Sequence, residues 1–199
     1  GLISSKLTIE GPIWKERTSF ILSGRRTYYD ILARPFIPEG TSFGYYFADV
    51  NAKVNHIFSR KDRLYLSYYT GIDDFGVREE YNNDPFFGGG DSEGYDESGL
   101  NWGNHTAALR WNHLFNDRLF SNLTATFTQY RFSIGFESYY RDGLDESSSG
   151  FEYFSLIRDY GLRYDLEYSL NNKHSLKYGA SYTFHTFKPG VAQIAENFN

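Results

Sequence analysis

Residues 157–168 read IRDYGLRYDLEY, and their side chains alternate in character from one position to the next. One set is uncharged and apolar or aromatic: Tyr160, Leu162, Tyr164, Leu166 and Tyr168. The interleaved set is mostly charged: Asp159, Gly161, Arg163, Asp165 and Glu167. Because successive side chains of a β-strand point to opposite faces, this period of two predicts a strand with one apolar and one charged face.

The same alternation occurs in three other segments, residues 46–58, 103–115 and 176–184, and their apolar faces have no formal charge. The opposite, polar positions include Asp49, Asn51, Lys53, Asn55, Arg110, Asn112 and Lys177. Helical periodicity is weak throughout. The pattern predicts eight strands, at about 2–10, 17–29, 43–58, 63–75, 102–115, 118–134, 153–170 and 174–187. After Gln129 the phase of segment 119–134 becomes blurred, which predicts a bulge or an early exit from the membrane.

Composition narrows the class of protein. Tyr and Phe number 18 each among 199 residues, and aromatic residues reach 20%. There is no Cys, which excludes disulfides and thiolate metal sites, and a net charge of −5 without a basic stripe argues against nucleic-acid binding. No apolar run approaches the roughly 18 residues of a membrane helix. The mean hydropathy of −0.55 is compatible with membrane strands, which are apolar only at alternate positions.

The predicted connections fall into two alternating classes. Short polar turns are expected at 11–17, 59–62, 116–117 and 171–173, and long connections at 30–42, 74–101, 136–149 and from Lys188 onward. Long loops on one side and tight turns on the periplasmic side are typical of outer-membrane β-barrels. We therefore predict a multi-pass β-barrel wall in the cell outer membrane, with its apolar stripe toward lipid. A soluble ligand-binding barrel with that stripe turned inward is an alternative.

Two strand ends have almost the same sequence. Residues 55–58 (NHIF), a turn and 62–64 (DRL) match residues 112–115 (NHLF), a turn and 117–119 (DRL). Each copy places an aromatic residue where a strand ends, which suits the boundary between membrane and water. We interpret the repeat as two hairpins with the same task rather than as a duplication.

The chain is also predicted to be part of a larger barrel. Several predicted strands exceed the roughly 9–11 residues needed to cross a bilayer. Gly1 begins directly in strand-like sequence without a signal peptide, and residues 190–199 resemble a loop rather than a closing strand. A complete eight-stranded outer-membrane barrel serving adhesion or anchoring is the alternative.

Three stretches of the chain resemble TonB-dependent outer-membrane receptors, in the branch with an N-terminal carboxypeptidase-regulatory-like domain. The first is LTIEGPI at 7–13 with TSF at 18–20 and SGRRTY at 23–28. The others are DVNAKVNH at 49–56 with DRLYLS at 62–67, and WGN at 102–104 with LRWNHLF at 109–115. The resemblance implies a barrel of about 22 strands with a plug in its lumen. It also implies nutrient import, with outer-membrane lipid, the plug, TonB and a surface lipoprotein as partners. A non-transporting barrel subunit of an outer-membrane complex is a further alternative.

Candidate functional residues lie on the polar face and in one loop. We predict that Asp49, Asn51, Lys53, Asn55, Arg110, Asn112, Arg163, Asp165, Glu167 and Lys177 face the lumen, where they contact substrate or plug or simply line water. The acidic, glycine-rich loop 84–97 supplies the binding candidates Phe86, Phe87, Asp91, Glu93, Tyr95 and Asp96. Calcium is the alternative ligand of this loop, although the spacing does not match an EF-hand. No catalytic constellation appears and the five His show no ligand spacing, so neither an enzyme nor a metal cofactor is expected.

Overall fold

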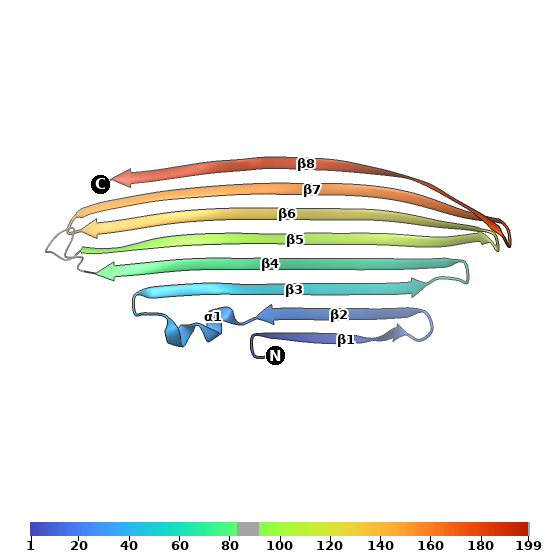
Figure 1. The fold of residues 1–199 in the computed structure, drawn as a ribbon, viewed down its shortest axis with the longest axis horizontal. Coiled ribbons are helices and arrows are strands. Elements are labelled where there is room, and N and C mark those ends of the chain that lie inside the picture. The colour runs from blue at the N-terminus through green and yellow to red at the C-terminus, as the bar shows by residue number, and fades with distance from the viewer. Residues whose placement is uncertain (83–91, 199) are drawn as a thin grey trace.

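The computed structural model describes residues 1–82 and 92–198, which form one antiparallel sheet (Figure 1). Its strands are β1 (Ser4–Trp14), β2 (Thr18–Thr27), β3 (Thr41–Ile57), β4 (Asp62–Asn82), β5 (Ser92–Asn116), β6 (Leu119–Asp142), β7 (Asp145–Asn171) and β8 (His174–Phe198). A short helix α1 (Tyr29–Leu32) and a 3-10 turn η1 (Arg34–Phe36) separate β2 from β3. The strands lie in chain order, each hydrogen-bonded to its neighbours in sequence. The predicted all-β, antiparallel, eight-stranded architecture is confirmed.

The sheet is open. β1 pairs only with β2 and β8 only with β7 in the described part of the chain, so these two strands form opposite edges (Figure 1). Residues 1–82 and 92–198 therefore do not make the complete eight-stranded barrel considered above. Each edge strand presents unpaired backbone N–H and C=O groups, which are strong hydrogen-bonding groups able to receive a further strand.

The later strands are much longer than predicted. The expected long connection 136–149 is instead a tight hairpin, in which Asp142 pairs with Asp145 around residues 143–144. The segment from Lys188 belongs to β8, and most of 74–101 belongs to β4 and β5. Cross-strand ion pairs stabilise these loop-like sequences as strands: Arg78 lies 3.3 Å from Glu97, and Arg141 lies 2.7 Å from Glu93. Among the connections that the structure describes, the one between β2 and β3 is long as predicted.

At the other end of the sheet, local side chains stabilise three of the tight turns. Ser59, Asn116 and Asn171 each accept hydrogen bonds from the backbone N–H groups two and three residues further on, at 2.9–3.1 Å. These are the turn conformations that Ser and Asn favour. In the fourth turn Glu16 has φ of 63°, a left-handed conformation that is uncommon for residues other than glycine.

The prediction of a bulge after Gln129 is wrong. β6 pairs with β7 without any shift of register from Leu119 to Asp142. The alternation simply changes phase: apolar residues occupy odd positions as far as Phe127 and even positions from Tyr130 onward. Because no extra residue intervenes, the apolar side chains move from one face of the sheet to the other. A real irregularity occurs between β7 and β8, where Pro189 cannot donate to the ladder and the register shifts.

Hardly any side chain is buried. Among the described residues the core contains a single hydrophobic side chain, Leu156, which is 9% exposed, while Leu162 is 54% and Tyr182 70% exposed. The sheet is one layer, and no second layer of the described residues packs against it (Figure 1). No helix within residues 1–82 and 92–198 is both long and apolar enough to cross a membrane. An exposed apolar sheet face of this size needs a partner layer or an apolar environment.

Candidate functional site

The pairing register assigns every strand residue to one of two faces. Face A is the face of Leu162, and face B is that of its neighbour Arg163. Leu66, Leu109, Ala125, Leu162 and Tyr182 are direct cross-strand partners in succession and form one row on face A from β4 to β8. The corresponding row on face B contains Arg110, Thr124 and Arg163.

An apolar band crosses face A on the half of the sheet nearest the short turns. In the later strands the band covers residues 64–72 of β4, 103–111 of β5, 119–127 of β6, 160–170 of β7 and 176–184 of β8. Its face A positions include no Asp, Glu, Lys or Arg. Each strand thus contributes about 9–11 residues, the length of a strand that crosses a bilayer.

The band ends toward the short turns in two matching histidine–phenylalanine pairs. His56 packs edge-on against Phe58 with ring centroids 4.3 Å apart, and His113 against Phe115 at 4.5 Å. His56 Nδ1 lies 2.7 Å from Thr18 Oγ1, and His113 Nδ1 lies 2.6 Å from an Asp62 carboxylate oxygen. The sequence repeat therefore builds the same ring arrangement twice. An apolar phenyl ring beside a polar imidazole suits a boundary between lipid and water.

Asp62 is the most connected carboxylate at this end of the sheet. It accepts hydrogen bonds from Ser59 Oγ at 2.8 Å and Trp111 Nε1 at 3.2 Å, besides its contact with His113. The His113 hydrogen bond, followed by that from Ser59, holds the pKa of the Asp62 carboxyl below its usual value. The carboxylate links the turn between β3 and β4 to the end of β5.

All ten residues predicted to face the lumen lie on face B, in two groups. Those on β3 are Asp49, Asn51, Lys53 and Asn55. Arg25 of β2 forms an ion pair with Asp49, with its Nε 2.7 Å from a carboxylate oxygen. The second group comprises Arg110, Asn112, Arg163, Asp165, Glu167 and Lys177. There Arg163 lies 2.8 Å from Asp165, and Lys177 lies 3.0 Å from Glu167. Strand β4 separates the two groups, so the structure does not bring the ten residues into one site.

Beyond the apolar band, face B becomes aromatic, a feature that the sequence analysis missed. Its side chains there include Phe43, Tyr45, Phe75, Leu100, Trp102, Phe132, Ile134, Phe136, Phe151 and Tyr153. Ring centroids of Phe43 and Phe75 are 5.8 Å apart, and Tyr29 of α1 stacks on Tyr45 at 5.5 Å. The phase change in β6 is the sequence signal that could have predicted this aromatic surface, because it moves apolar side chains to face B.

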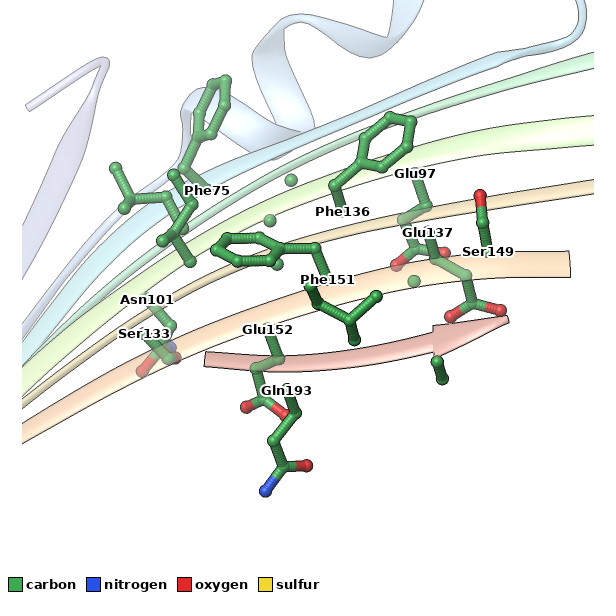
Figure 2. A pocket seen from close by; sticks show the side chains of 18 of the residues that line it. Phe75, Glu97, Asn101, Ser133, Phe136, Glu137, Ser149, Phe151, Glu152 and Gln193 are labelled. Atoms are coloured by element: carbon green, nitrogen blue, oxygen red, sulfur yellow. The ribbon is translucent and has the colours of Figure 1, made fainter. Parts of the chain in front are cut away.

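Face A beyond the band is polar and is hollowed by glycines. Gly44, Gly76, Gly99 and Gly135 are cross-strand partners in succession, and a groove of about 660 Å³ lies over the last three. Figure 2 shows Glu97, Glu137, Glu152 and Gln193 on one side of the sheet, with Phe75, Phe136 and Phe151 projecting from the other. The two faces have therefore exchanged polarity relative to the band.

The loop-binding candidates are divided between two situations. Phe86, Phe87 and Asp91 lie outside the described residues. Glu93, Tyr95 and Asp96 belong to β5 rather than to a loop, and Glu93 is engaged by Arg141. The Tyr95 ring lies 3.8 Å from the Arg78 guanidinium, and its hydroxyl donates a 2.7 Å hydrogen bond to Glu137 that raises the pKa of Tyr95.

A calcium site receives no support from the described part of the molecule. No three His, Asp or Glu side chains in residues 1–82 and 92–198 are grouped so that they could hold a metal ion. Residues 84–91 of the predicted acidic loop lie outside that range. The calcium interpretation therefore stays a prediction for those residues.

Comparison with known proteins assigns no family. No protein-family model matches the chain, and no curated protein matches it.

Proposed function

We propose that the chain is part of the wall of an outer-membrane β-barrel, with face A toward lipid and face B toward the lumen. The apolar band supports this proposal. Strands of 9–11 residues rise about 3.3 Å per residue and, tilted by about 40°, span about 25 Å, which is the height of the apolar belt of such barrels. No described residue covers the band, so its apolar side chains are exposed. Contact with lipid would avoid the free-energy cost of exposing this apolar surface to water.

The open edges fit the same proposal. A spanning sheet cannot leave backbone groups unpaired in lipid, so β1 and β8 each require a further strand inside the membrane. The sheet is then one sector of a larger, closed barrel. Its tight turns at residues 15–17, 58–61, 117–118 and 172–173 face the periplasm, and the longer parts of β4 to β8 rise beyond the outer surface.

We further propose that this barrel is a TonB-dependent receptor that imports a nutrient. The resemblance of segments 7–28, 49–67 and 102–115 to that class supports the proposal. A lumen wall bearing both signs of charge also suits the polar surface of a plug: Arg110, Arg163 and Lys177 stand beside Asp165 and Glu167 on face B. The plug and TonB would then be partners of the complete protein, which acts as a transporter and not as an enzyme.

Two adjacent residues of β6 provide the test of orientation. The chain has no Cys, so Ala125→Cys on face A and Thr126→Cys on face B each introduce a single thiol for a fluorophore. In membranes containing a lipid-attached quencher, we expect strong quenching at Ala125 and weak quenching at Thr126. A water-soluble quencher should act in the opposite order. Equal quenching at both positions would contradict the proposed wall.

The transport step has a separate test. The complete reading frame should encode a plug domain before β1, and cross-linking in cells should join the complete protein to TonB. A protein without a plug that fails to cross-link to TonB would be a non-transporting barrel subunit. That result would overturn the transport proposal and leave the barrel proposal intact.

A further inference from the structure

The short turns of the sheet concentrate positive charge at one end of the molecule. Their residues include six cations, which we call the cationic rim: Lys15, Arg17, Arg60, Lys61, Arg118 and Lys173. The same four turns contain only two carboxylates, Glu16 and Asp117. All four turns lie at the same end of the sheet (Figure 1). A chain with a net charge of −5 thus has a positive edge.

No ion pair neutralises this edge. None of the salt bridges among residues 1–82 and 92–198 involves a cation of the rim, and all six side chains are exposed. The nearby carboxylate of Asp62 is already engaged by Ser59, Trp111 and His113. Cations elsewhere on the sheet, such as Arg25, Arg141 and Arg163, do have carboxylate partners. The rim therefore keeps its charge available for an external anion.

The rim borders the apolar band directly. Each strand that leaves a short turn reaches its first apolar face A residue within three positions of a rim cation: Phe20, Leu64, Leu119 and Leu176 follow Arg17, Lys61, Arg118 and Lys173. Three positions of a strand correspond to about 10 Å. Arg17 also lies over the Trp14 ring at 5.0 Å. A cation beside an aromatic ring at the end of an apolar belt is the arrangement of a residue at the lipid headgroup level.

At the opposite end of the sheet, the described hairpin between β6 and β7 has the opposite charge. The hairpin between β6 and β7 has Asp142, Asp145 and Glu146 around its tip, against Arg141, which Glu93 already neutralises. In the described residues charge is thus polarised along the strands, and the short-turn end is the one that suits an anionic surface.

We propose that the cationic rim binds the phosphate headgroups of anionic phospholipids in the leaflet that the short turns face. This inference rests on the proposed insertion of the apolar band in a membrane. Two observations point to this occupant. The rim is continuous with the apolar band, and its positive charge is complementary to an anionic headgroup. A depression of about 560 Å³ between two neighbouring turns offers one headgroup position, and its lining includes the cations Arg118 and Lys173 and one carboxylate, Asp117.

The test compares lipids with and without net charge. The protein, including the rest of its barrel, is reconstituted in phosphatidylcholine vesicles that contain brominated phosphatidylglycerol or brominated phosphatidylcholine, and quenching of its tryptophans is measured. Trp14 adjoins the rim and reports the composition of its lipid shell. Each cation near an anionic surface contributes about fivefold in binding. We expect brominated phosphatidylglycerol to quench the tryptophan fluorescence at a concentration at least about fivefold lower than brominated phosphatidylcholine. High salt should reduce this preference.

Three variants locate the effect. Replacing Lys61, Arg118 and Lys173 by Gln should reduce the preference for phosphatidylglycerol, because half of the six rim cations are then lost. The charge-conserving substitutions Lys61→Arg, Arg118→Lys and Lys173→Arg should preserve the preference. The matched control replaces Lys6, Arg34 and Lys188 by Gln. These cations are exposed and have no ion pair with any described residue, so the same charge is removed and the preference should remain.

The outcomes separate this inference from the function on which it rests. Equal quenching of the parent by both lipids would overturn headgroup binding while showing that the protein is inserted. A rim variant that keeps the full preference would overturn the assignment to these cations. Absence of quenching by either lipid would overturn the membrane wall itself, and with it the lipid site.

Discussion

Adjacent residues of one strand face different surroundings, as Leu162 and Arg163 of β7 illustrate. Leu162 lies within the apolar band, between Ala125 and Tyr182, and is 54% exposed on face A. On face B, Arg163 is paired with Asp165 in an exposed contact. In a bilayer, Leu162→Arg should cost up to about 2–4 kcal/mol of folding free energy, the penalty for a cation at the lipid-facing midplane. Guanidinium unfolding in lipid vesicles measures it.

The neighbouring substitution is the matched control. Arg163→Leu removes an exposed ion pair, which contributes about 0–1 kcal/mol, and its effect on the same unfolding free energy should be correspondingly small. Equal costs at positions 162 and 163 would mean that both faces meet the same environment, which the proposed wall does not allow.

Asp62 makes the end of the sheet sensitive to acid. Its hydrogen bond with His113 lowers its pKa in the folded protein, so its stabilising contribution is complete above the ordinary pKa of the carboxyl. The contribution is lost as the pH falls through the lowered value. Asp62→Asn should therefore reduce the melting temperature at neutral pH, and the difference from the parent should shrink in strong acid. A difference that grew with acidity would contradict this role.

At the scale of elements, the tight hairpin between β6 and β7 depends on one glycine. Gly143 has φ of 60°, and Asp142 pairs with Asp145 across the turn. A left-handed conformation costs an L-residue about 1–2 kcal/mol, so Gly143→Ala should weaken the hairpin by about that amount. Hydrogen exchange at the tips of β6 and β7 should then become faster.

Gly135 of the same strand is the control for that substitution. Its φ is not positive, and an added Cβ would meet no atom closer than the Phe151 carbonyl oxygen at 3.7 Å. Gly135→Ala should leave exchange at the hairpin tip unchanged. Similar acceleration by both substitutions would mean that loss of glycine, and not the backbone conformation at 143, weakens the hairpin.

The sequence predicted the central parts of the strands better than their ends. Alternation identifies strands such as 157–168 because one face is consistently apolar there, and the same phase placed all ten polar candidates on face B. The outer halves escaped prediction because apolar side chains change face between Phe127 and Tyr130. Glycines and charges in segment 74–101 also suggest a loop, and only the cross-strand partners of Arg78 and Tyr95 reveal a strand. Such pairing depends on register, which periodicity within one strand does not specify.

At the scale of the whole molecule, one sheet has two uncovered faces and two open edges. A soluble domain buries one face of a sheet against another layer, yet here even the central row of Leu109 and Leu162 is exposed. Charge and polarity both change along the strand direction: cationic turns come first, then an apolar band, and then an acidic and glycine-lined outer part. This axial order fits a wall that passes through layers of different polarity.

The sheet as a whole should therefore require an apolar solvent. We expect the 199-residue chain to associate in aqueous buffer without detergent and to disperse with its β-structure intact in detergent micelles. Replacing Leu66, Leu109 and Leu162 of the central face A row by Ser should reduce that association, because each removes large exposed apolar surface. Sedimentation with and without detergent measures the change, and Ser67→Ala, Ala108→Ser and Thr126→Ser on face B form the control. A chain that stays monomeric and cooperatively folded without detergent would instead favour a soluble barrel with its apolar face turned inward.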